Sequence, residues 1–110
     1  MNYVNFEAGN KAYKLRLNTR NVVALEKALG ANPLSIFDVE GNELPPVTAL
    51  VAVLHASLQQ YNHGISLNDA YEIFDAYLED GNSVDKFIYV VLDIYRESGL
   101  IPKEDATEKN

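Results

Sequence analysis

The chain contains no cysteine, so it can form no disulfide, thiolate nucleophile or thiolate metal site. Long apolar runs are also missing. The longest, Val47–Leu54, is interrupted by Thr48 and is far shorter than the roughly 20 residues that a membrane-spanning helix needs. The opening residues MNYVNFEAG have neither the basic segment nor the apolar run of a secretory signal. These absences predict a cytoplasmic protein that does not associate with a membrane.

Basic side chains are in the minority, with 9 Lys and Arg against 16 Asp and Glu, a formal net charge of -7 and a pI near 4.6. This balance predicts no nucleic-acid partner, because affinity for a phosphate backbone comes largely from Lys and Arg that displace counterions. The basic residues cluster in the first quarter and leave the later helices acidic. Such a pattern indicates either a dipolar surface that docks a basic partner or, more commonly, a solvated face. The clustered residues are Lys11, Lys14, Arg16, Arg20 and Lys27.

Arrangements that carry catalysis or bind metal are absent from the sequence. His55 and Ser57 lie two residues apart in a predicted helix, and that spacing faces them away from each other, so they form no nucleophile–base pair. The acidic run 69–80 offers calcium ligands, but an EF-hand register would place the apolar Ala76 and Leu78 at ligand positions. No phosphate-binding loop and no HExxH motif occurs. We therefore predict no enzyme activity, no catalytic residue, no cofactor and no metal.

A strand that leads into a helix is the clearest local pattern. In Tyr13–Phe37, YKLRLNTRNVVALEKALGANPLSIF, apolar residues first alternate with Lys14 and Arg16. They then recur at a period near 3.6 until Gly30 and Pro33 end the pattern. This stretch has no chemically reactive group, and its signals concern packing.

An amino-terminal hairpin precedes this helix. The expected strands Tyr3–Phe6 and Ala12–Leu17 flank the turn Glu7–Lys11, which is rich enough in Gly and Asn to close a hairpin of the longer-loop kind. Two strands alone are only marginally stable, so the hairpin must pack on the helices or on another copy of the chain. The predicted fold class is α+β, mostly α-helical, with the N-terminal β-hairpin followed by about four helices plus a short helical turn.

One small globular domain, residues 1–102, accounts for nearly the whole chain, because 110 residues are enough for one core. The segment 103–110, KEDATEKN, has no large apolar residue and is expected to be a disordered acidic tail. The expected elements are the hairpin 3–17 and helices at about 19–29, 33–37, 46–61, 67–80 and 84–98.

The last predicted helix has few polar positions between Lys86 and Arg96. A helix that is apolar nearly all round is normally buried on every side, whereas an exposed apolar face usually marks an interface. This helix is therefore either the central element of the core or the bearer of a surface for another chain. Its interaction candidates, the only site residues that we name, are Phe87, Tyr89, Val90, Ile94 and Tyr95.

Three segments together resemble the small tail assembly chaperones of long-tailed bacteriophages and prophages of Gram-positive bacteria. They are Tyr13–Phe37, then LHASLQQYNHGISLNDAYEIFDAYLEDG at Leu54–Gly81, and FIYVVLDIYRESGLI from Phe87. The quoted residues are packing and turn residues, so the resemblance lies in the whole pattern. It covers nearly all of the chain except the acidic tail.

The resemblance implies a non-catalytic protein of the host bacterial cytoplasm that is absent from the mature virion. Its implied partners are the tape measure protein, which it binds, and the tail tube protein, which it recruits during tail morphogenesis. Many copies would be needed to coat a long substrate, so we expect self-association, driven by the final helix or by the edge of the hairpin.

Two other functions fit the same sequence. The first is a phage structural adaptor, such as a head–tail completion protein, which would remain in the virion. The second is an acidic regulatory or antitoxin-like binding module, which would mimic nucleic acid or mask a basic toxin.

Overall fold

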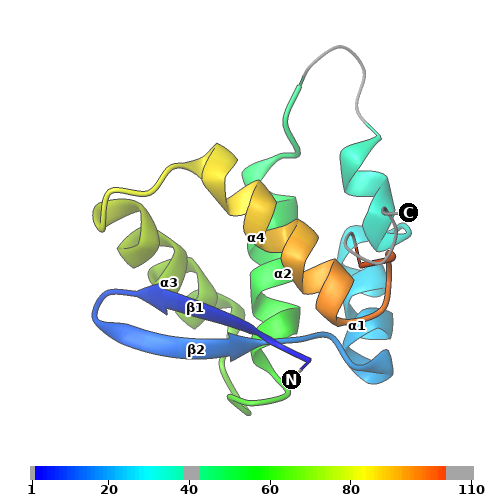
Figure 1. Ribbon diagram of the computed structural model, residues 1–110, viewed down its shortest axis with the longest axis horizontal. Coiled ribbons are helices and arrows are strands. Elements are labelled where there is room, and N and C mark those ends of the chain that lie inside the picture. The colour runs from blue at the N-terminus through cyan, green and yellow to red at the C-terminus, as the bar shows by residue number, and fades with distance from the viewer. Residues whose placement is uncertain (1, 39–42, 104–110) are drawn as a thin grey trace.

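The computed structural model describes residues 2–38 and 43–103 (Figure 1). It confirms the predicted α+β, mostly helical fold class, with one antiparallel hairpin, four α-helices and a 3-10 helix. The predicted tail lies outside the described residues except for Lys103, whose Nζ is 3.2 Å from Oε1 of Glu97. In chain order the elements are β1 (Val4–Ala8), β2 (Lys11–Leu15), α1 (Thr19–Leu29), η1 (Pro33–Phe37), α2 (Val47–Leu58), α3 (Leu67–Glu79) and α4 (Val84–Glu97).

A two-residue turn closes the hairpin, so the prediction of a longer loop at 7–11 is wrong. Ala8 pairs directly with Lys11, and the turn residues Gly9 and Asn10 have φ values of 60° and 70°. Positive φ at both central positions matches the twist of the flanking strands, and Gly and Asn tolerate it best. The turn therefore fixes a register in which alternate residues of both strands share one face.

The helix that is buried nearly all round is α2 and not the last helix. Figure 1 shows α2 in the middle of the molecule, with α4 crossing in front of it, α1 on one side and α3 on the other. α2 contacts all three of these helices and β2. Its 12 residues are the most apolar helical segment, yet no helix within 2–38 and 43–103 is long and apolar enough to cross a membrane. The buried residues of α2 are Ala49, Leu50, Val51, Val53, Leu54, Ala56, Ser57 and Leu58.

Side-chain caps begin α1 and α3, whereas α2 begins after Pro46 without one. Asn18 accepts from the N–H of Asn21 at 2.8 Å at the start of α1, and Gly30, with φ 71°, ends that helix. Ser66 and Asp69 form a reciprocal capping box at the start of α3. These caps hold the ends of α1 and α3, so the corners between elements are defined.

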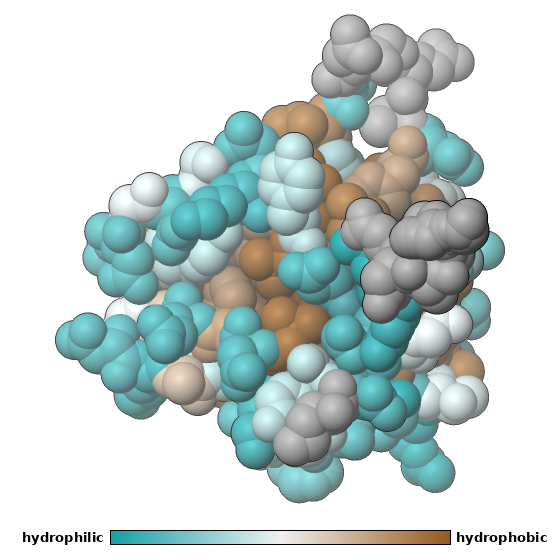
Figure 2. Space-filling view, in the orientation of Figure 1, coloured by the Kyte–Doolittle hydropathy of each residue, from teal (hydrophilic) through white to brown (hydrophobic). Residues whose placement is uncertain are grey.

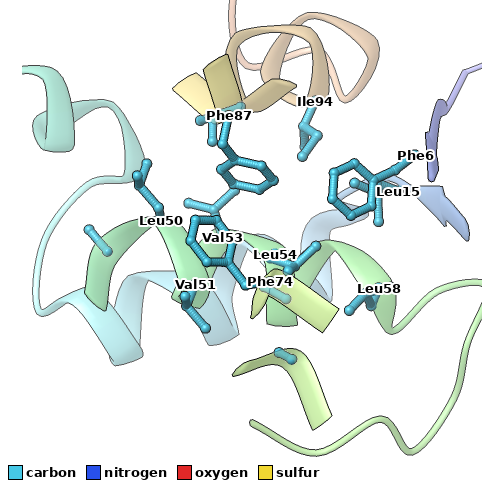
Figure 3. Close-up of a cluster of buried hydrophobic side chains, with 14 of the residues drawn as sticks. Phe6, Leu15, Leu50, Val51, Val53, Leu54, Leu58, Phe74, Phe87 and Ile94 are labelled. Carbon is cyan, nitrogen blue, oxygen red and sulfur yellow. The ribbon is translucent and has the colours of Figure 1, made fainter. Parts of the chain in front are cut away.

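Aromatic rings fasten the hairpin to the helices (Figure 3). Phe6 of β1 lies 5.1 Å from the ring of Tyr77 in α3 and 5.7 Å from the ring of Phe87 in α4, as measured between centroids. Phe74 and Phe87 meet edge to face at 5.1 Å. Edge-to-face pairs of this kind add to the stabilisation from buried area. The hairpin thus packs on α3 and α4 of its own chain.

Candidate interaction site

Three of the five interaction candidates belong to the core, which corrects the prediction for them. Phe87, Ile94 and Tyr95 are fully buried on the inner face of α4. Tyr89 is 69% exposed on the outer face, and Val90 is half-buried between the two faces. The correction has a simple cause, since α4 is amphipathic and its apolar side covers α2.

Tyr95 holds the 3-10 helix in place. Its hydroxyl donates to the carbonyl of Pro33 at 2.9 Å, and its ring meets that of Phe37 edge to face at 6.1 Å. Burial raises the pKa of Tyr95 far above its usual range. The residue therefore acts as a buried, neutral hydrogen-bond donor in the core, and Tyr89 and Val90 are the candidates that remain on the surface.

The hairpin offers backbone groups at both of its outer edges. In an antiparallel pair, opposed residues alternate between those that bond each other and those whose N–H and C=O groups point outward. The turn makes Ala8 and Lys11 a bonded pair, so the backbone N–H and C=O groups of Asn5 and Glu7 point outward from β1. The backbone groups of Lys14, which is paired with Asn5, point outward from β2.

The end of α2 covers the outer edge of β2, whereas the outer edge of β1 is open. The N–H of Arg16, just after β2, donates to the carbonyl of Ser57 at 3.0 Å. In the described part of the chain, no hydrogen bond from outside the hairpin reaches the backbone of Asn5 or Glu7. An edge strand with unpaired groups is a template for another strand. The hairpin therefore has one edge available for pairing.

A groove of about 670 Å³ lies beside the open edge of β1. The hairpin forms one wall, and the corner between α3 and α4 forms the other. Figure 2 shows the hollow on its left side, with hydrophilic side chains on both banks and apolar ones toward the middle of the molecule. We call it the β1 groove. Its lining includes Asn5, Glu7, Tyr77, Asn82, Lys86 and Val90.

Hydrogen bonds make the end of the β1 groove rigid. The N–H of Gly9 donates to Oδ2 of Asp80 at 2.8 Å, which ties the hairpin turn to the end of α3. The two elements are so close here that a Cβ on Gly9 would lie 3.0 Å from the Cβ of Ala76. Only glycine combines that approach with a φ of 60° at low cost.

The opposite wall of the β1 groove is also connected by hydrogen bonds. Asn82 Nδ2 donates to the carbonyl of Tyr77 at 3.0 Å, and Lys86 Nζ donates to Oδ1 of Asn82 at 2.9 Å. These two bonds connect the end of α3, the corner and the start of α4 in the unbound chain.

Tyr77 is the unusual side chain of this wall. It is 4% exposed, and its buried hydroxyl has no hydrogen-bond partner in the described part of the chain. Burial, with a smaller contribution from the negative charge of Asp85, raises the pKa of Tyr77 above its ordinary value. The phenol is therefore protonated at neutral pH and has a donor to offer.

A second, smaller groove of about 430 Å³ lies on the other side of the hairpin, against α3. Its lining combines apolar side chains, among them Tyr13, Ile65 and Ile73, with the charged residues Lys11, Asp69 and Glu72. Such a groove can receive an apolar side chain.

The two histidines form no reactive arrangement with neighbouring side chains in the described residues. His55 Nε2 lies 3.1 Å from the carbonyl of Ile65, and Gln59 Nε2 donates to the same carbonyl at 2.8 Å. These contacts hold the loop after α2. Among the residues that the structure describes, no group of three His, Asp or Glu side chains is placed to hold a metal ion.

Comparison with known proteins identifies a family. Residues 4–110 match the family of unknown function DUF6096. The chain belongs to this family. No curated protein and no solved structure matches it. For this member of DUF6096, the argument about function therefore depends on its own residues and geometry.

Of the residues that line the β1 groove, the sequence singled out Val90 alone as an interaction candidate. Alternation in VNFEA marks Asn5 and Glu7 as exposed, but it does not say which strand edge the helices leave open. Tyr77 lies on the apolar side of α3 like an ordinary core residue. Only the long-range packing of α3 and α4 around the hairpin brings these residues together.

Proposed function

We propose that this member of DUF6096 is a phage tail assembly chaperone. In this role it binds the tape measure protein and recruits tail tube subunits during tail morphogenesis, without catalysis. It acts in the host bacterial cytoplasm and is absent from the mature virion. The identity of the partners comes from the resemblance of Tyr13–Phe37, Leu54–Gly81 and the α4 segment to such chaperones.

The open edge of β1 beside a preformed groove is the observation that best supports this proposal. Main-chain groups at a strand edge bind polypeptides of many sequences, because every segment carries the same backbone donors and acceptors. An assembly chaperone needs this kind of surface, since its client is captured before it has packed. The net charge of -7 favours the solubility of the chain itself.

Self-association is part of the same proposal. Tyr89 is 69% exposed on α4, and tyrosine is enriched at interfaces. We expect copies of the chain to meet through this face, so that several of them can coat a long client.

Co-expression tests the proposed function. The chain is produced with the tape measure protein and the tail tube protein of the same phage or prophage genome. A chaperone is expected to keep the tape measure protein soluble, to purify with it, and to be missing from purified particles by mass spectrometry. A chain that remains in the particles would instead be a structural adaptor. A chain that purifies with neither tail protein would rule out the proposal.

A further inference from the structure

We propose that the open edge of β1 binds an extended segment of a different protein as a third strand, with uncharged, apolar side chains directed into the β1 groove. The inference does not depend on which protein supplies the segment. It depends on the backbone groups of Asn5 and Glu7, the hydroxyl of Tyr77 and the charges of the groove.

Backbone pairing is the first part of the argument. β1 is five residues long and pairs only with β2, so its outer N–H and C=O groups are free to bond a new strand. A two-stranded hairpin is marginal by itself, and a third strand with an apolar face gives a more stable sheet. The edge of β2 cannot serve equally, because Arg16 already bonds Ser57 of α2 beside it.

Tyr77 lines the β1 groove and has a buried hydroxyl without a partner among the described residues, which is a second observation at the same place. A buried O–H without an acceptor costs free energy that a bound carbonyl would recover. Tyr77 is a donor, and the negative charge of Asp85 near it disfavours an anionic acceptor. A neutral oxygen such as a main-chain carbonyl fits both requirements.

The charges of the groove exclude a strongly charged segment. The lining contains two acidic residues, Glu7 and Asp80, and two basic ones, Lys11 and Lys86, so charges are balanced there although the chain as a whole carries -7. Val90 adds an apolar contact on the α4 side. Because successive side chains of a strand point to opposite faces, the expected segment alternates apolar residues with residues that face the solvent.

Nuclear magnetic resonance with a synthetic probe tests the inference. The probe is an acetylated and amidated heptapeptide of alternating valine and threonine, added to ¹⁵N-labelled full-length chain. We expect shifts centred on the amides of Asn5, Glu7 and Val90, and slower hydrogen exchange of the Asn5 and Glu7 amides. No shift at millimolar peptide would overturn the proposal. Concentration-dependent shifts of Asn5 and Glu7 without peptide would identify a second copy as the occupant and would also overturn it.

Two N-methylated forms of the peptide provide a matched comparison on the wild-type protein. One carries methyl groups on the valine amides and the other on the threonine amides. Only one set of amides can face β1 in a paired strand, so one form is expected to lose binding and the other to keep it. Equal binding by the two forms would exclude strand pairing, whatever the protein variants do.

Protein variants locate the site. Asn5→Pro removes an outward N–H from β1 and is expected to abolish binding, whereas Lys14→Pro makes the same change at the other edge and should leave binding unchanged. Tyr77→Phe should weaken binding about fivefold, as expected for one neutral hydrogen bond of about 1 kcal/mol. Circular dichroism checks that each variant is folded. Retained binding in folded Asn5→Pro would contradict the proposed site.

Discussion

Three tyrosines of α3 and α4 have different surroundings and therefore different roles. Tyr95 is fully buried and bonded to Pro33, and Tyr77 is buried beside the β1 groove with its hydroxyl unpartnered in the described structure. Tyr89 is mostly exposed. A hydroxyl contributes to stability only where it satisfies a buried partner, so equivalent substitutions at these positions should differ in effect.

Removal of the Tyr95 hydroxyl should destabilise the fold. Tyr95→Phe leaves the carbonyl of Pro33 without its buried donor and should lower the free energy of unfolding by about 1–2 kcal/mol. Urea denaturation followed by circular dichroism measures the loss. Tyr89→Phe is the matched control, because an exposed hydroxyl should change stability by less than about 0.5 kcal/mol. Equal effects of the two substitutions would contradict the assigned role of Tyr95.

Stability should fall in alkaline solution because of the same side chains. The pKa values of Tyr95 and Tyr77 are raised in the folded state, whereas an unfolded tyrosine titrates near about 10. Their contribution to the free energy of unfolding is therefore complete below about pH 10 and is lost as the pH rises toward the folded pKa. The reason is that the unfolded state then releases protons that the folded state keeps. Urea denaturation between about pH 8 and pH 11 should show this decline, and Tyr95→Phe should make it shallower. If the stability of Tyr95→Phe declined with pH as steeply as that of the wild type, Tyr95 would not be a source of the decline.

At the scale of secondary-structure elements, the hairpin depends on how closely its turn approaches α3. Gly9→Ala places a Cβ 3.0 Å from that of Ala76 at a φ of 60° and should cost more than the roughly 1–2 kcal/mol of the backbone strain alone. Gly64→Ala is the control, because its φ is 84° but no atom lies within 4 Å of the added Cβ. Thermal and urea unfolding of both variants compare the two losses. A loss in Gly9→Ala no larger than in Gly64→Ala would mean that the contact with α3 relaxes freely.

The sequence predicted the elements well because local signals define them. Gly30 ends α1 as the sequence indicates, and the switch of period after Leu17 separates strand from helix. The sequence-based prediction was wrong where the answer depends on packing between segments that are distant in the chain. α2 is the most apolar helix and lies at the centre, whereas α4 is amphipathic and Ile94 is on its buried side.

The candidate site was harder to predict than the fold for the same reason. Of the five residues proposed on α4, only Tyr89 and Val90 reach the surface. The β1 groove joins residues more than 70 positions apart, as the bond from Gly9 to Asp80 shows. No local pattern records such a contact, and the unpaired state of the β1 edge depends on where α2, α3 and α4 end.

At the scale of the whole molecule, net charge should control self-association. Copies that each carry a net charge of -7 repel one another. At 0.1 M salt this repulsion is largely screened beyond about 10 Å. If the exposed face of α4 around Tyr89 holds copies together by apolar contact, association should be stronger at high than at low ionic strength. Sedimentation velocity at micromolar concentration, in low and high salt, measures the change.

The variant that tests this interface must leave the core intact. Ile94 is unsuitable, because a charge at that buried position would unfold the chain. Tyr89→Asp adds a charge on the exposed face and should shift the protein to monomer even in high salt, whereas Tyr89→Phe keeps the ring and should associate like the wild type. Because both substitutions are at a mostly exposed position, both variants should retain the wild-type unfolding midpoint. A wild-type chain that stays monomeric at high micromolar concentration in both salts, or an associated Tyr89→Asp variant, would show that the α4 face is not the contact between copies.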